Sequence, residues 1–139
     1  MSELVEWRAG VRTRLHAAAS TGARQLCVLE QWCDPGAGAP LHTHFEVEEL
    51  IAVVEGSAEF TVDGAVFAVG AGESILLAPH GWHAFRNVGD EVLHTLAVFA
   101  AAAPPVEYEN EPGVVYTIGG SGGDRRDAHR ALGGPGDAG

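Results

Sequence analysis

The sequence predicts an all-β fold in which short antiparallel strands form a closed barrel or two facing sheets. From Gln25 onward, about eight runs rich in β-branched and other apolar residues recur at intervals near ten residues. Glycine, proline and aspartate separate these runs, which is typical of small antiparallel barrels and sandwiches. Helical periodicity is weak along the chain, and only a turn or two of helix is expected, around residues 15–19.

The predicted strands are each supported by their composition and by the turn residues that end them. In order, they cover residues 25–33, 41–44, 49–55, 59–62, 66–69, 74–78, 83–87 and 92–100. Asp34-Pro35-Gly36 ends the first run, and Gly56 ends the third. Asp63-Gly64 is the strongest hairpin signal, because this dipeptide suits the positive φ angles of a tight type I′ turn.

Length and composition favour a single domain. The chain has 139 residues, of which 46% are hydrophobic and 19% charged, an ordinary globular composition. We expect an N-terminal segment at 1–24, a barrel core at 25–100, a segment at 101–118 that lies across the outside of the barrel, and a disordered tail at 119–139. The tail consists mainly of Gly, Asp, Arg, Ala and Pro and offers almost nothing to bury.

The charge balance excludes two classes of partner. The chain has 19 acidic residues against eight basic ones, a net charge of −11 at pH 7. Nucleic acid and anionic membranes both require a basic surface, so neither is expected as a partner. The apolar stretch at 96–106 is too short to span a bilayer and contains two prolines. Because Glu3 and Glu6 do not fit a signal peptide, a cytoplasmic protein is expected.

The two cysteines agree with that compartment. Cys27 and Cys33 fall in one predicted strand, which separates their Cα atoms by roughly 20 Å. A disulfide requires Cα atoms within about 7 Å. Both residues are therefore expected to be buried free thiols.

Histidines and an acid in the middle of the chain indicate a metal site. His42 and His44 project from one face of an extended strand, so their imidazoles can converge. Glu49 lies at an odd spacing from His44, so the chain must turn or bulge within residues 45–48 for all three to meet. His83 begins a later strand after a Pro-Gly turn. Imidazoles with a carboxylate suit Fe, Mn, Ni, Co, Cu or Zn.

Two motifs in this region resemble those of the cupin superfamily. The first is Gly, five residues, His-x-His, three or four residues, Glu, six residues, Gly; it is matched at Gly36, His42, His44, Glu49 and Gly56. The second is Gly, five residues, Pro-x-Gly, two residues, His, three residues, Asn; it is matched at Gly72, His83 and Asn87. Its middle departs from the pattern, because Pro79 stands one place late and His80 occupies the glycine position.

The resemblance implies a small double-stranded β-helix, a jelly-roll-like barrel, with one divalent metal inside. The implied ligands are His42, His44, Glu49 and His83. Glu48 competes with Glu49, because it satisfies the shorter family spacing to His44 although it breaks the spacing to Gly56. Four protein ligands on an octahedral ion leave two positions for water, O2 or a chelating substrate. Cupins commonly pair through their sheets, so a homodimer is expected.

The resemblance supports more than one function. The first hypothesis is a dioxygenase-like enzyme that acts on a small oxygenated molecule able to chelate the metal. A non-oxidative isomerase, lyase or cyclase, including the polyketide-cyclase type, is an alternative, and a non-catalytic small-ligand-binding protein is another. A DNA-binding regulator is not expected, because no helix-turn-helix segment fits the chain and the charge has the wrong sign.

Three further residues are candidates for catalysis: His80, Glu30 and His94. His80 fits either a surface turn or the pocket rim, where it would carry protons near the metal. His94 fits the outer face of its strand, and the opposite parity would place it inside. Glu30 lies on one face of its predicted strand and Gln31 on the other, and the sequence leaves open which face is internal.

Overall fold

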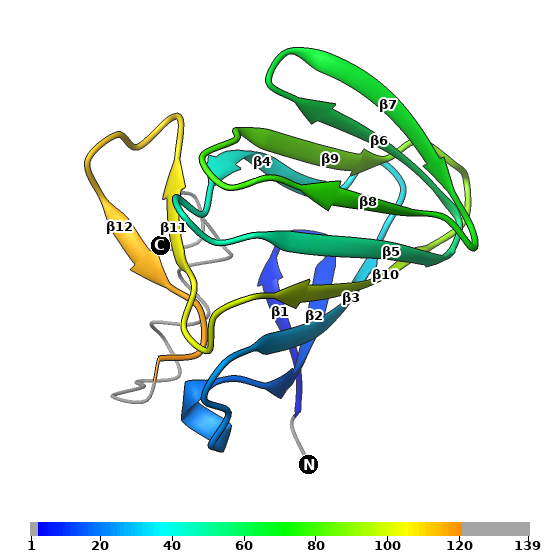
Figure 1. Cartoon of the computed structure of the whole chain (residues 1–139). Helices are drawn as coiled ribbons and strands as arrows, with labels where there is room; N and C mark the ends of the chain where they lie inside the picture. The colour runs from blue at the N-terminus through cyan, green and yellow to red at the C-terminus, as the bar shows by residue number, and fades with distance from the viewer. Residues whose placement is uncertain (1–2, 121–139) are drawn as a thin grey trace.

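Two antiparallel six-stranded sheets face each other and enclose the core (Figure 1). The computed structural model describes residues 3–120, so the part of the predicted tail from residue 121 onward lies outside the described residues. This double-sheet architecture confirms the predicted all-β class. Within residues 3–120, no helix is both long and apolar enough to cross a membrane.

The strands are distributed between the sheets in a non-sequential order. The first sheet has the order β1 (Leu4–Arg8), β2 (Val11–Ala17), β3 (Cys27–Cys33), β10 (Leu93–Phe99), β5 (Glu49–Glu55) and β8 (Ser74–Leu77). The second has the order β12 (Val115–Thr117), β11 (Pro105–Tyr108), β4 (Gly38–Thr43), β9 (His83–Asn87), β6 (Ser57–Val62) and β7 (Ala65–Gly70). A short 3₁₀ turn, η1 (Ala19–Thr21), follows β2.

The predicted hairpin is confirmed. β6 pairs with β7 in antiparallel register, with Val62 opposite Ala65. Asp63 and Gly64 between them have φ angles of 48° and 87°. Both values lie in the left-handed region that a type I′ turn requires. The predicted strands at 49–55 and 83–87 also coincide with β5 and β9.

The helical turn expected at residues 15–19 is wrong. β2 runs to Ala17, and the only helical turn in the described residues comes later, at η1. Buried Val11 and Thr13 alternate with half-exposed arginines along β2, which is the period of a strand. β1 pairs with β2, so the N-terminal segment adds two strands to the first sheet.

Residues 101–118 continue the second sheet; they do not lie across its outside as expected. β11 pairs with β4, and β12 pairs with β11. The physical reason is apolar burial, because Val106, Tyr108 and Ile118 are at most 1% exposed. Gly119, expected in the tail, is also buried, and its carbonyl oxygen accepts a hydrogen bond from the backbone N–H of Ser20 at 3.0 Å.

Cys27 and Cys33 are free, fully buried thiols at the two ends of β3. Burial raises the pKa of each thiol to about 12. Neither side chain is therefore a thiolate at neutral pH, and a nucleophilic role is excluded for both.

Candidate metal centre

Four polar side chains meet in the space between the two sheets. His42 lies near the end of β4, His44 follows that strand, and His83 opens β9 directly opposite His42. Glu49 opens β5 of the facing sheet. All four side chains are buried, each at most 5% exposed. Such complete burial of polar groups is costly unless they have a partner.

The turn needed to bring Glu49 to the histidines is present. Phe45 has a φ of 58°, and its backbone N–H donates to Thr43 Oγ1 at 3.2 Å. The Val47 N–H donates to the carbonyl oxygen of His44, which reverses the chain before β5. Glu49 is buried, whereas Glu48 is exposed, so Glu49 is the acid at this cluster.

The ligand atoms of the cluster converge on a common point. One ring nitrogen from each of His42, His44 and His83 lies within 4.8 Å of the other two. Glu49 Oε1 lies 3.3 Å from Nε2 of His44 and 3.3 Å from Nε2 of His83. These three atoms form no hydrogen bond, although all three are buried. Buried donors and acceptors without hydrogen-bond partners fit a set of side chains that can bind a cation.

The outer nitrogens fix the orientation of two rings. His42 Nδ1 is 2.6 Å from the carbonyl oxygen of Pro40, and His44 Nδ1 is 2.9 Å from that of Pro105. Because a carbonyl oxygen only accepts, each Nδ1 carries the hydrogen, which leaves Nε2 as the lone-pair donor. Metal-binding histidines are typically oriented in this way. The donor set therefore fits a divalent transition metal.

Electrostatics keep two members of the cluster, His42 and Glu49, in the protonation state that binds a metal. Burial, together with the nearby imidazoles of His83 and His44, holds the pKa of His42 well below its usual value of 6.5. Burial alone would raise the pKa of Glu49, but the His44 and His83 imidazoles outweigh it and lower that pKa to about 2. At neutral pH His42 is a neutral imidazole and Glu49 a carboxylate.

The metal-free protein is expected to lose stability as the pH falls below about 6.5. In that range the unfolded chain protonates His42, whereas the folded chain keeps it neutral, so added protons favour unfolding. Below about pH 4.5 the unfolded chain also protonates Glu49, and that stabilisation is lost as the pH falls toward 2. Urea denaturation at about pH 7.5 and pH 5.5 measures the effect.

A matched pair of variants identifies the responsible histidine. His42→Gln is expected to reduce the difference in the free energy of unfolding between the two pH values. His80→Gln, at an exposed turn, is expected to retain that difference. If the parent chain had an equal or higher urea midpoint at the lower pH, the assignment of the pH dependence to His42 would be contradicted.

A small cavity adjoins the cluster on the inner side of the sheets. Its volume is about 20 Å³, on a scale where one water needs roughly 10–15 Å³. Four polar residues other than the predicted metal ligands also line the cavity: Arg8, Gln31, Thr95 and Tyr108. The apolar part of the lining includes Ile51, Phe85 and Phe99.

The structure settles which face of β3 is internal. Gln31 is buried and donates through Nε2 to Thr13 Oγ1 at 3.0 Å, and it lines the cavity. Glu30 instead lies on the outer face of the first sheet, where it contacts Nε2 of His16 at 2.8 Å and Nε2 of His94 at 2.5 Å. These neighbours lower the pKa of Glu30 against the opposing effect of burial.

The three other catalytic candidates are therefore not brought to the cavity. Glu30 and His94 are not among its lining residues. His94 packs its ring flat on Trp32, with centroids 4.8 Å apart, on the outer face. His80 is exposed in the turn before β9 and has a φ of 68°.

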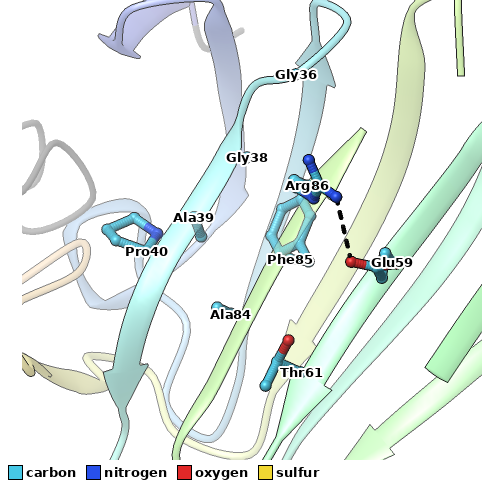
Figure 2. Close-up of a pocket in the computed structure, with 9 residues that line it drawn as sticks. All are labelled: Gly36, Gly38, Ala39, Pro40, Glu59, Thr61, Ala84, Phe85 and Arg86. Atoms are coloured by element: carbon cyan, nitrogen blue, oxygen red, sulfur yellow. Dashed lines mark hydrogen bonds and ion pairs between the residues drawn. The ribbon is translucent and has the colours of Figure 1, made fainter. Parts of the chain in front are cut away.

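A larger hollow lies on the outer face of the second sheet. Its volume is about 300 Å³. Figure 2 shows its lining residues, which come from β4, β9 and β6 and from Gly36 before β4. Along β9, Ala84 and Arg86 alternate with the buried residues His83 and Phe85. Because Ala84 and Arg86 line the hollow, it lies on the outer face of the sheet. Its two charged residues, Arg86 and Glu59, pair with each other at 3.5 Å (Figure 2). The metal-ligand cluster identified in the described residues lies elsewhere.

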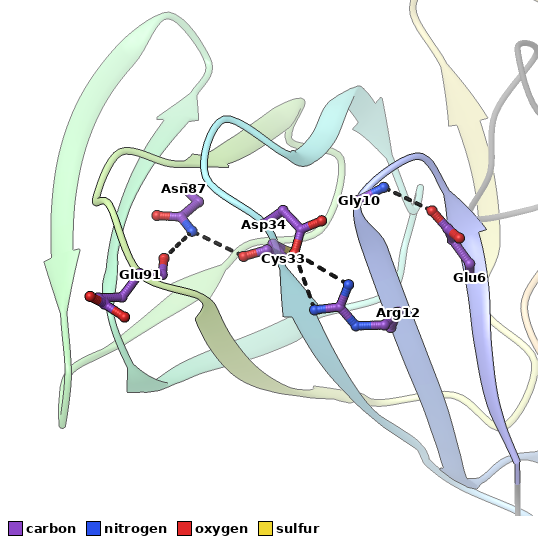
Figure 3. Close-up of polar contacts among 7 residues, drawn as sticks. All are labelled: Glu6, Gly10, Arg12, Cys33, Asp34, Asn87 and Glu91. Carbon is purple, nitrogen blue, oxygen red and sulfur yellow. Dashed lines mark hydrogen bonds and ion pairs between the residues drawn. The ribbon is translucent and has the colours of Figure 1, made fainter.

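Asn87, the last residue of the second motif, supports the loops and not the metal. Its side-chain Nδ2 donates to the carbonyl oxygens of Cys33 at 3.0 Å and Glu91 at 2.7 Å (Figure 3). On β2, which pairs with β3, Arg12 forms an ion pair with Asp34 at 3.2 Å (Figure 3). These contacts hold the β3–β4 connection, which leads into the strand that carries His42.

Comparison with known proteins agrees with this architecture. A profile of the Cupin domain matches residues 31–99. The chain is 32% identical over 92 residues to the polyketide synthase CurC of Streptomyces cyaneus, a match that covers 66% of this chain and 57% of that protein. The match thus spans less than two thirds of that relative.

Solved structures share the fold at lower identity. An oxalate decarboxylase of Lactobacillus farciminis, solved as a formate complex, has a TM-score of 0.70 and 22% identity, over 78% of this chain and 34% of that one. An RmlC-like cupin from Shewanella frigidimarina has a TM-score of 0.64 and 22% identity, over 73% of this chain and 86% of that one. Identity at this level demonstrates the fold alone.

Proposed function

The chain belongs to the cupin superfamily, and from that premise we propose that it is an enzyme that holds one divalent transition metal and acts on a small oxygenated molecule able to chelate it. The metal would be Fe, Mn, Ni, Zn, Co or Cu. The observation that carries the proposal is the set of inward-facing atoms without hydrogen-bond partners on His44, Glu49 and His83, beside His42.

Each residue of the site would have a distinct role. His42, His44 and His83 would hold the metal through neutral nitrogens, and Glu49 would supply one negative charge. A bound divalent ion acts as a Lewis acid that makes a chelated hydroxyl or enol group easier to deprotonate. Apolar residues such as Ile51 and Phe99 line the cavity and would keep bulk water from the reacting group.

The first form of this proposal is a dioxygenase-like enzyme. The cavity is small, which favours a substrate of few atoms. The test is oxygen uptake by protein purified without chelator and assayed against a panel of small hydroxy acids, keto acids and catechols. Uptake that depends on both substrate and metal supports the dioxygenase. Substrate turnover without uptake supports an isomerase, lyase or cyclase, and binding without turnover supports a non-catalytic ligand-binding protein.

Ring closure of a polyketide is a second candidate function. The observation that favours it is the 32% identity to a polyketide synthase of Streptomyces cyaneus. A polyketide chain, or the ring formed from it, would have to remain at the cavity mouth or displace lining side chains, because the cavity volume is only about 20 Å³. Product analysis with a linear poly-β-ketone under nitrogen separates this reaction from oxygen-dependent chemistry.

A further inference from the structure

One edge strand of the second sheet lacks the features that normally prevent a strand from pairing with another chain. The two sheets end at β1, β8, β12 and β7. We propose that β7 pairs in antiparallel orientation with β7 of a second copy of this chain, which joins the second sheets of the two copies into one. This inference is independent of the proposed function, because it concerns a surface and not the metal centre.

The other three edges are protected, whereas β7 is not. Proteins normally protect an edge strand by short length, charged side chains, proline or a bulge. β8 has four residues and β12 has three, and β1 carries Glu6 and Arg8 with a register shift between them. β7 has six residues, AVFAVG, with no charge, no proline and no register shift against β6. Val66 and Phe67 on this strand are 62% and 47% exposed.

The free backbone groups of β7 belong to Val66 and Ala68. Ala65 directly follows the two-residue hairpin turn, so it is hydrogen-bonded to β6, and alternate residues after it have the same orientation. Val66 and Ala68 therefore direct their N–H and carbonyl groups away from β6. The Gly70 N–H shares this direction and donates to Glu73 Oε1 at 2.7 Å, which ends the free edge. Within residues 3–120, β7 pairs with β6 alone, and Figure 1 shows it as the outermost strand of its sheet.

A second β7 fits this edge across a two-fold axis that passes through Phe67. Val66 of each copy then lies opposite Ala68 of the other, and each of these residues both donates its N–H and accepts at its carbonyl oxygen. Phe67 lies opposite its own equivalent. It is on the inner face of the sheet, because its neighbour on β6 is Phe60, which is 0% exposed. The two Phe67 rings therefore cover each other's exposed surface. Because the contact uses the same edge on both copies, it gives a closed dimer.

The charge of the chain favours self-association at this edge over other surfaces. The net charge is −11, so two copies repel each other over most approaches. β7 carries no charge. The one acid on the paired strand β6 is Glu59, which lies opposite Ala68 and is paired with Arg86 at 3.5 Å. Contact through β7 therefore brings little like charge together.

Sedimentation equilibrium of the parent and two double variants tests the inference. Val66→Lys/Ala68→Lys places lysine side chains opposite each other across the axis and is expected to weaken the dimer by at least about tenfold. This weakening is expected although the variant lowers the net negative charge of the chain. Val66→Glu/Ala68→Lys is the matched control, because it places glutamate opposite lysine at the same positions. Its dimer affinity is expected to stay within about threefold of the parent.

Three results would overturn the inference. The first is a parent chain that is monomeric at every concentration, whether or not the edge binds a strand of another protein. The second is a dimer that neither variant weakens, and the third is an equal loss in both variants. If the variants do not fold, amide hydrogen exchange of the parent decides. The Val66 and Ala68 N–H groups are expected to exchange more slowly in concentrated than in dilute samples, and equal rates would contradict the proposed pairing.

Discussion

Replacing Glu49 with glutamine is expected to lower the affinity for a divalent metal by at least about tenfold. The amide keeps the size of the side chain but removes its charge and half of its acceptor capacity. Three neutral imidazoles cannot offset the charge of the cation, and Glu49 Oε1 is the atom that faces His44 and His83 at 3.3 Å. Metal content after dialysis, measured by elemental analysis, is the readout, and any metal-dependent activity is expected to fall in parallel.

Glu46→Gln and Glu48→Gln are the controls, because both residues are exposed in the turn that precedes β5. Both variants are expected to retain the metal content of the parent. If Glu48→Gln loses metal while Glu49→Gln retains it, the ligand assignment is wrong by one residue. If neither change matters, the carboxylate does not bind the metal and the site consists of three histidines.

Gly38→Ala is expected to lower the free energy of unfolding by more than about 3 kcal/mol or to prevent folding. A Cβ at this position would lie 2.0 Å from the carbonyl oxygen of Phe85 and 2.7 Å from the Cα of Arg86. Both atoms belong to the backbone of β9, so the contact is relieved only if β4 and β9 separate. Because these strands carry His42 and His83, loss of metal binding should accompany the loss of stability, which urea denaturation measures.

Gly89→Ala serves as the comparison for this steric argument. A Cβ at Gly89 would meet no atom closer than 3.5 Å, an ordinary contact distance. This variant should therefore unfold within about 1 kcal/mol of the parent. Equal stabilities of Gly38→Ala and Gly89→Ala would show that β4 and β9 can move apart at little cost.

Much of the central barrel could be predicted from the sequence because its signals are local. Asp63-Gly64 favours a tight turn. The run at 49–55 is rich in β-branched residues, and in the structure it forms β5, where buried and exposed positions largely alternate. β2 carries a local strand signal too, because Val11 and Thr13 alternate with arginines, but the helical turn expected at residues 15–19 did not take it into account. β11 forms because it pairs with β4, far away in the sequence, and no local pattern encodes that pairing.

In the candidate metal site, too, the local features could be predicted and the non-local ones could not. The convergence of His42 and His44 follows from the two-residue period of a strand, and the odd spacing to Glu49 correctly required a turn. The inward position of Gln31 depends on which sheet covers β3, which the chain's local pattern does not specify. Arg8 was not predicted as a cavity residue because its direction depends on a bulge in β1.

Cobalt binding to the intact chain tests the central claim most directly. The account predicts one equivalent of Co²⁺ per chain, with absorption typical of nitrogen and oxygen ligands, and loss of that binding in both His44→Gln and His83→Gln. His80→Gln, at an exposed turn outside the cavity, should bind cobalt as the parent does. A parent chain that takes up no cobalt, or full binding by His83→Gln, would contradict the claim that these buried side chains form a metal site.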